Sequence, residues 1–341
     1  MEKRVESKRH LLEAIDQNEN EIKLSSDLIS FPTVSPPGRN SAQAQNHIQS
    51  YLENIGFSMS RWEEYSGDPN LIGVRKGTNP QRYKSLIING HVDVAEIGDI
   101  KEWSFDPFKP FVDNARLHGR GAADMKDGLA ACMFAAKVLK DAGTELKGDL
   151  IFHSVTGEEA GEGITLKCLE HGPRADFVIV ADTSDLKIQG QGGVITGWIT
   201  IQSLTTHHDG IRSKMIHAGG NLFAASAIEK MVKVIQGLQE LEHFWAVNKF
   251  YEGFLPGSNT INPAVIQGGR NAAFIADQCE LWVTVHYYPD EDHDQICIEI
   301  EEHILNVASG DPWLKCYPPK FRWGGKSMLE ERGGRFFHLL N

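Results

Sequence analysis

The 341-residue sequence is poor in three features that would each point to a class of protein. Its 5 cysteines are an odd number without a CxxC pair, which argues against a disulfide framework and a thiolate zinc site. Basic residues are outnumbered 34 to 46, and a net charge of −12 has the wrong sign for a protein that tracks a phosphate backbone. The uncharged run Gly128–Ala136 is far shorter than the roughly 18 residues of a membrane span. We expect no nucleic-acid partner and no membrane.

The amino-terminal segment Met1–Lys23 is charged throughout. It lacks the apolar stretch of a secretory signal, so we expect a cytoplasmic protein. A hydrophobic content of 41% excludes disorder. At about 150 residues per domain, the length predicts two domains.

Short apolar runs alternate with helical patterns in the first half of the chain. Expected strands at Ser85–Gly90, Asp149–Val155 and Phe177–Ala181 are separated by helical patterns at Lys126–Ala142 and Ile164–His171. This order predicts parallel βαβ units. The fold class is therefore α/β, a mostly parallel mixed sheet with helices on both faces. Two further helical patterns precede the first run, at Leu11–Ile29 and Ala42–Ile55.

Beyond residue 190 the pattern changes to the alternation of an α+β module. We expect residues 191–310 to form an inserted lid or dimerisation domain. Residues 1–190 and 311–341 would then form the catalytic domain. The elements expected in the insert are a strand at Trp198–Gln202, a helix at about Ala224–Gln239 and a strand at Glu280–His286.

Histidine and carboxylate side chains follow the expected strands. Ligands of open α/β sheets bind beyond the carboxyl ends of the strands, so these positions are the place to look for chemistry. A further aspartate lies in a glycine-rich turn that runs into a helix. The residues concerned are His91, Asp93, Asp124, Glu158, Glu159 and Asp182. We expect them to face one crevice.

Several carboxylates in a partly dry cleft repel one another unless a cation neutralises them. Imidazole and carboxylate ligands without thiolate suit zinc, cobalt or manganese. Each residue alone also has a structural explanation, as a solvated helix start or a helix cap. A nucleotide site is disfavoured, because neither GxGxxG nor a Walker loop follows a strand. The ordered set predicts a catalytic metal centre.

Longer motifs carry a family resemblance over nearly the whole chain. They are Ile88–Val94, Trp103 with Asp106–Phe108, Leu117–Lys126 and Thr156–Gly161. Together they resemble the co-catalytic metallohydrolases that include acetylornithine deacetylase, succinyl-diaminopimelate desuccinylase, aminoacylase and bacterial carboxypeptidases.

The resemblance implies two divalent metal ions, usually zinc, with cobalt or manganese as alternatives. Asp124 would bridge the two ions. His91 and Asp182 would complete the first site, and Glu159 with a histidine near the carboxyl terminus would complete the second.

The resemblance also implies catalytic roles. Glu158 matches the general base that activates a metal-bound water, and Asp93 matches the carboxylate that orients the metal-binding histidine. In family members a histidine of the inserted domain reaches across a homodimer to the oxyanion. We place that role on His207, with His208 and His217 as competitors.

The expected substrate-binding residues are Asn262, His286 and Arg270. His286 stands where the family has an arginine that binds the substrate carboxylate, so a bidentate clamp is lost there. Arg270 or Arg212 would replace it. The leading function is a deacylase that hydrolyses the amide of a small N-acyl amino acid or amine, like acetylornithine deacetylase. The alternative is a formylaminopyrimidine deformylase, because the substrate need not be an amino acid.

The end of the chain departs from the family pattern. The tail Gly333–Asn341 stands where more sheet and the last metal-binding histidine are expected, and His338 is its only histidine. We expect a truncated member, through a frameshift near Gly333, whose second metal site lacks one ligand. A non-catalytic remnant is the alternative from another class.

Overall fold

The structure is a computed structural model that describes residues 11–13, 15, 20–35, 40–160, 163–183 and 192–324. It divides into two compact units, Met1–Lys187 and Ile188–Asn341. Among the helices of the described residues, none combines the length and the apolar content that a membrane span requires.

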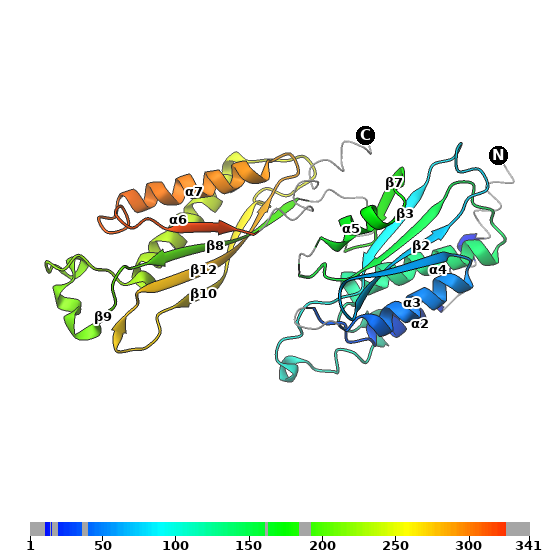
Figure 1. Cartoon of the computed structure of the whole chain (residues 1–341), viewed down its shortest axis with the longest axis horizontal. Helices are drawn as coiled ribbons and strands as arrows, with labels where there is room; N and C mark the ends of the chain where they lie inside the picture. The colour runs from blue at the N-terminus through cyan, green and yellow to red at the C-terminus, as the bar shows by residue number, and fades with distance from the viewer. Residues whose placement is uncertain are drawn as a thin grey trace. The chain divides into compact units, whose positions relative to one another are not determined.

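The first unit is built on a mixed sheet with strand order β1-β2-β6-β3-β7 within the described residues (Figure 1). Strand β3 pairs in parallel with β6 and β7, whereas β1, β2 and β6 pair antiparallel. The helices of this unit are α2 (Asn20–Ile29), α3 (Ala42–Asn54), α4 (Asp127–Asp141) and α5 (Ile164–His171), with the turns η1 (Ile100–Glu102) and η2 (Ala122–Lys126). Its strands are β1 (Ser58–Tyr65), β2 (Asp68–Arg75), β3 (Leu86–His91), β4 (Phe111–Asp113), β5 (Arg116–His118), β6 (Leu150–Val155) and β7 (Phe177–Val180).

Helices cover both faces of this sheet, as the α/β assignment predicts. On one face Leu28, Leu52 and Met133 of α2, α3 and α4 share a core cluster with Phe152 of β6. On the other face α5 packs through Cys168 against the alternate residues of the same strands. All six residues of β6 are buried, including the polar residues His153 and Ser154 that follow the apolar run Leu150–Phe152.

The second unit has an antiparallel sheet with strand order β10-β12-β8-β13 and two long helices, α6 and α7 (Figure 1). The helices cover one face, where the inward residues of β8 and β12 meet Trp245 and Ile300. The elements of this unit are β8 (Gly193–Gln202), β9 (His207–His208), η3 (Asp209–Lys214), η4 (Ile216–Ala218), α6 (Ala227–Asn248), β10 (Thr260–Gly268), β11 (Phe274–Ile275), β12 (Gln278–Tyr287), α7 (His293–Ser309) and β13 (Lys320–Trp323).

The segment 311–324 lies in this second unit. Strand β13 pairs with β8, and Trp313 and Leu314 are buried in the same core as α6 and α7. The expectation that residues 311–341 return to the catalytic domain is therefore corrected for the described part. The physical reason is that these apolar side chains complete the core beneath the helices of the second unit.

Candidate metal centre

His91 is the last residue of strand β3, which lies between β6 and β7 in the sheet. Its side chain is only 1% exposed. Its Nδ1 atom lies 3.0 Å from the carbonyl oxygen of Asp93 and 3.4 Å from Oδ1 of the same residue. These contacts occupy Nδ1 and leave Nε2 for other partners.

Asp124 lies in the turn η2 that precedes helix α4. Its backbone is extended, with φ −128° and ψ 100°, and a cis peptide bond joins it to Met125. Gly121 opens the turn with φ +81°, and a Cβ atom there would lie 2.4 Å from Cγ1 of Val94. The turn can therefore lie close to the segment after β3, where Oδ1 of Asp124 is 3.1 Å from Nε2 of His91.

Asp182 completes a group of three potential metal ligands. One ligand atom from each of His91, Asp124 and Asp182 can be chosen so that all three atoms lie within 4.8 Å of one another. One imidazole nitrogen and two carboxylate oxygens are ligands that suit zinc and similar divalent cations. The donor set of this group fits such an ion.

The two glutamates after β6 have different surroundings. Oε2 of Glu158 lies 3.7 Å from Nε2 of His91. Oε1 of Glu159 accepts a hydrogen bond of 2.8 Å from the backbone N–H of Ala95, and the N–H of Glu159 donates to Oδ2 of Asp93. Glu158 thus lies beside the group of three, whereas Glu159 lies outside it and is tied to the loop after β3.

The charges of the cluster shift the pKa values of its members. Burial lowers the pKa of His91, but hydrogen bonds to Asp124 and Asp93 outweigh burial and raise it to about 11. The hydrogen bond from His91 lowers the pKa of Asp124. Burial raises the pKa of Glu158 to about 7. The positive charge of His91 opposes this shift, and the negative charges of Asp182 and Glu159 add to it. A carboxylate poised near neutrality is suited to proton transfer.

Two cationic residues near Asp124 have no role in the sequence predictions. Lys126 is fully buried, its Nζ donates a 2.7 Å hydrogen bond to the carbonyl oxygen of Phe31, and burial lowers its pKa to about 7. Arg120 donates to the carbonyl oxygen of Glu96 and lies over the ring of Trp103. Both stand inside the glycine-rich motif around Asp124, and this is the sequence signal by which they could have been found.

The three candidate oxyanion histidines belong to the second unit and differ in their partners. His208 accepts a hydrogen bond from the N–H of Gly210, and His217 lies 3.2 Å from a carboxylate oxygen of Glu229. Nε2 of His207 lies 2.9 Å from the hydroxyl oxygen of Thr205. Of the three, His207 is not paired with a carboxylate or used to cap a turn in the described contacts.

The predicted substrate-binding residues are also in the second unit. Asn262 of β10 lies opposite Thr284 of β12, so Asn262 and His286 are on the same face of the sheet, away from the helices. Both are exposed. The guanidinium of Arg270 contacts the carboxylate of Asp277, which already balances its charge. His338 and the expected frameshift near Gly333 lie outside the described residues.

The model of Peptidase family M20/M25/M40 matches residues 87–314. This match includes the group around His91 and most of the second unit. The chain belongs to this family. It is an enzyme, an amide hydrolase of the M20 type.

Two curated proteins are similar to this M20 chain over nearly its whole length. The N-formyl-4-amino-5-aminomethyl-2-methylpyrimidine deformylase of Bacillus subtilis (strain 168) is 57% identical over 94% of this chain and 75% of the relative. The protein of the same name from Halalkalibacterium halodurans is 55% identical over 96% of this chain and 77% of the relative.

Solved structures of M20 proteins share the fold of this chain. An M20 family metallo-carboxypeptidase from Sulfolobus solfataricus has a TM-score of 0.67 at 17% identity and covers 91% of this chain and 78% of its own. A dinuclear metal-binding M20 peptidase from Bacillus subtilis has a TM-score of 0.56 at 19% identity and covers 89% of this chain and 72% of its own.

Proposed function

We propose that this M20 enzyme removes the formyl group from N-formyl-4-amino-5-aminomethyl-2-methylpyrimidine. The observation that carries the proposal is the identity of 57% and 55% to two deformylases over nearly the whole chain. The relatives thus favour the alternative from the sequence analysis over its leading function, the hydrolysis of an N-acyl amino acid.

The position of His286 also supports an uncharged substrate. The substrate named for the relatives carries amino, methyl and formyl groups but no carboxylate, so it needs no arginine clamp. The face that holds Asn262 and His286 offers an amide and an imidazole next to the hydroxyl of Thr284. These groups can donate to and accept from the nitrogens of an aminopyrimidine. We retain Asn262 and His286 as substrate-binding residues. Because the guanidinium of Arg270 is paired with Asp277, we expect Arg270 to contribute less to substrate binding than Asn262 and His286 do.

We propose a metal centre for two ions, with His91, Asp124 and Asp182 as ligands of the first ion and Glu159 as a ligand of the second. The observations that support it are the donor group around His91 and the dinuclear site of an M20 relative. Divalent cations bound there, zinc or alternatively cobalt or manganese, supply Lewis acidity toward the formyl oxygen and acidify water.

Glu158 is the proton carrier in this proposal. It takes a proton from the attacking water, whose oxygen forms a bond to the formyl carbon. The carbon–nitrogen bond then breaks, and Glu158 returns the proton to the leaving nitrogen. The products are formate and the aminomethylpyrimidine. Asp93 holds the ring of His91 through Nδ1, and His207 is the proposed donor to the oxyanion.

The quaternary structure and the cellular location remain proposals. We propose a homodimer formed through residues 191–310 and a cytoplasmic location, with a small molecule as the substrate. Light scattering coupled to size-exclusion chromatography tests the dimer, and a monomer mass at micromolar concentration would contradict it.

The function is tested with purified protein supplied with Zn²⁺ or Co²⁺. Formate release and amine production are measured with the formylaminopyrimidine, and product formation is measured with N-acetylornithine and N-succinyl-diaminopimelate. We expect kcat/KM for the formylaminopyrimidine to exceed the other two by at least about 100-fold, and chelation by EDTA to abolish activity. A higher kcat/KM for N-acetylornithine would contradict the deformylase proposal and support the hydrolysis of N-acyl amino acids instead.

A further inference from the structure

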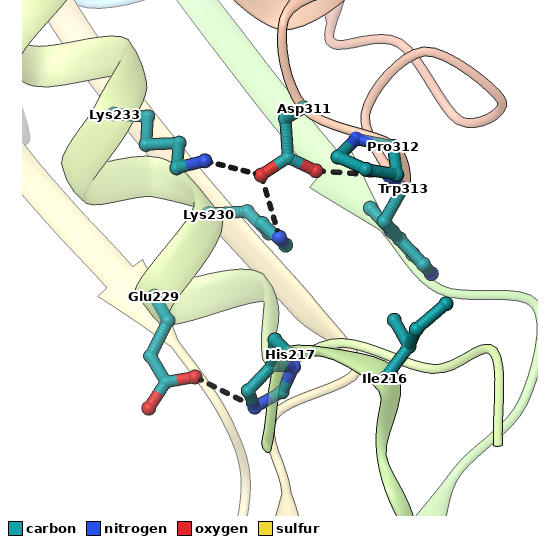
Figure 2. A pocket seen from close by; sticks show the side chains of 8 residues that line it. All are labelled: Ile216, His217, Glu229, Lys230, Lys233, Asp311, Pro312 and Trp313. Atoms are coloured by element: carbon teal, nitrogen blue, oxygen red, sulfur yellow. Dashed lines mark hydrogen bonds and ion pairs between the residues drawn. The ribbon is translucent and has the colours of Figure 1, made fainter. Parts of the chain in front are cut away.

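A cavity of the second unit lies between helix α6, the turn η4 and the segment that begins at Asp311 (Figure 2). Its volume is ≈ 330 Å³, at the lower end of the roughly 300–1,000 Å³ of small-molecule sites. Every lining residue belongs to the second unit, whereas the proposed metal ligands belong to the first. The established family activity assigns it no role.

One wall of the cavity carries an excess of positive charge. Lys230 and Lys233 reach from α6 to the same oxygen of Asp311, Oδ2, as Figure 2 shows. The Lys230 contact is 2.7 Å. The other oxygen, Oδ1, accepts hydrogen bonds of 2.9 and 3.0 Å from the backbone N–H groups of Trp313 and Leu314. Asp311 is therefore fixed in place, and two ammonium groups face a single carboxylate.

The carboxylate at the other end of the cavity does not balance this charge. Glu229 forms an ion pair with Arg212, which takes up its negative charge, and its other carboxylate oxygen lies 3.2 Å from Nε2 of His217. The second lysine on Asp311 is therefore in excess.

The two ammonium groups retain hydrogen-bonding capacity. An ammonium group has three N–H donors, and Asp311 is the acceptor found for each lysine among the described residues. The side chain of Lys230 is 9% exposed and that of Lys233 47% exposed. The site thus has one buried donor group and one donor group open to solvent. Ile216 and Trp313 add apolar surface beside them.

We propose that this cavity binds a small organic anion, with a carboxylate or phosphate group on Lys230 and Lys233 and an apolar body against Ile216 and Trp313. Charge-assisted hydrogen bonds to an oxyanion are about twice as strong as neutral ones. The excess charge sets the preference for an anion, and the apolar wall sets the preference for an organic one.

The test is calorimetric titration of the metal-loaded protein with benzoate, phenyl phosphate and the neutral analogue benzamide. We expect one or both anions to bind and benzamide to give no measurable heat. The tighter anion identifies the group that the cavity prefers. The absence of binding by both anions at millimolar concentration would overturn the proposal, as would equal binding of benzamide.

Variants assign the binding to the cavity. Lys233→Met keeps the pair of Lys230 with Asp311, and we expect it to weaken anion binding about tenfold or more, whereas Lys233→Arg retains binding. Lys320→Met, on β13, is the control and leaves binding unchanged. We expect His91→Ala to bind the anion as the wild type does, because His91 does not line the cavity. If the anion were bound by the metal centre instead, this variant would lose the binding. Wild-type affinity in Lys233→Met, or loss of binding in His91→Ala, would contradict the assignment.

The wild-type protein gives a second readout that does not depend on the folding of any variant. Binding to the lysines weakens as ionic strength rises, because screening shortens the range of the attraction. An anion affinity that does not change with added salt would also overturn the proposal.

Discussion

Gly128 and Ala181 bring two distant segments into contact. A Cβ atom built on Gly128 would lie 1.9 Å from the carbonyl oxygen of Ala181, so a residue with a side chain cannot occupy this position without a shift of the backbone. Gly128 is in the first turn of α4, and Ala181 follows strand β7. Their approach places Asp124, just before the helix, in the same group as Asp182.

Gly128→Ala is therefore expected to disturb both stability and metal binding. The added methyl group must push α4 away from Ala181, at a cost of about 1–3 kcal/mol of unfolding free energy. Urea denaturation measures the stability, and calorimetric titration with Zn²⁺ measures the affinity. Gly310→Ala is the control, because a Cβ atom there would be 3.6 Å from its nearest neighbour. Wild-type stability and zinc affinity in Gly128→Ala would show that the close approach does not position the ligands.

Glu158→Gln is expected to lower kcat by about 10²-fold to 10⁴-fold, because the amide can neither accept nor return the proton. Metal content, measured by inductively coupled plasma mass spectrometry, stays at the wild-type value. Glu145→Gln, at an exposed position of the same unit, serves as the matched control and retains activity. Retained activity in Glu158→Gln would rule out the proposed proton carrier.

Removal of the metal is expected to destabilise the first unit, because carboxylates around His91 then repel one another. A ligand that binds only the folded state at 100 times its Kd adds about 2.7 kcal/mol of stability. Thermal melting with Zn²⁺ or EDTA measures the difference, which should shrink in His91→Ala. His171→Ala, an exposed histidine of α5, is the control. If zinc raised the melting temperature equally in His91→Ala and in the wild type, the stabilising ion would not be bound by the cluster around His91.

His153 on strand β6 is expected to make stability depend on pH. Its side chain is buried, its Nε2 has no hydrogen-bond partner among the described residues, and burial lowers its pKa from 6.5 to about 4. Between these two pH values the unfolded chain binds a proton that the folded chain excludes, so stability falls as pH decreases from 6.5 to 4. The full effect of this group is on the order of 3 kcal/mol.

The measurement for His153 is urea denaturation across this pH range for the wild type and for His153→Met. The difference in unfolding free energy between the two proteins should move in favour of the variant as pH falls. His47→Met offers a comparison, because it replaces a histidine that is only half-buried, on helix α3. If the difference in unfolding free energy between the wild type and His153→Met did not change with pH, His153 would not be the source of the pH dependence.

Local sequence pattern was sufficient for much of the first unit. The helix expected at Ile164–His171 has those bounds in the structure, and the strand expected at Asp149–Val155 is β6, Leu150–Val155. Helix α5 buries Ile164 and Cys168, which are spaced for one helix face, and β6 buries all of its residues. The pair β1 and β2 went unpredicted. All eight residues of β1 are exposed or only partly buried, which weakens the apolar signal there.

The sequence pattern predicted fewer elements of the second unit. The helix expected at Ala224–Gln239 is α6, which continues to Asn248. Helix α7 and strand β13 were not predicted, and residues 311–324 were assigned to the other domain. Nothing in a local pattern says which sheet a terminal strand will join, because strand pairing is a long-range contact.

The sequence by itself determined the order of the histidine and the carboxylates after the strands, their types and the motifs of the M20 family. Tertiary structure decided which of them meet. His91, Asp124 and Asp182 form one group because parallel strands end at the same edge of the sheet and because two glycines allow close backbone approach. Tertiary structure alone also placed Lys230 and Lys233 on Asp311, since a buried charge is stabilised by partners that the fold brings from far along the chain.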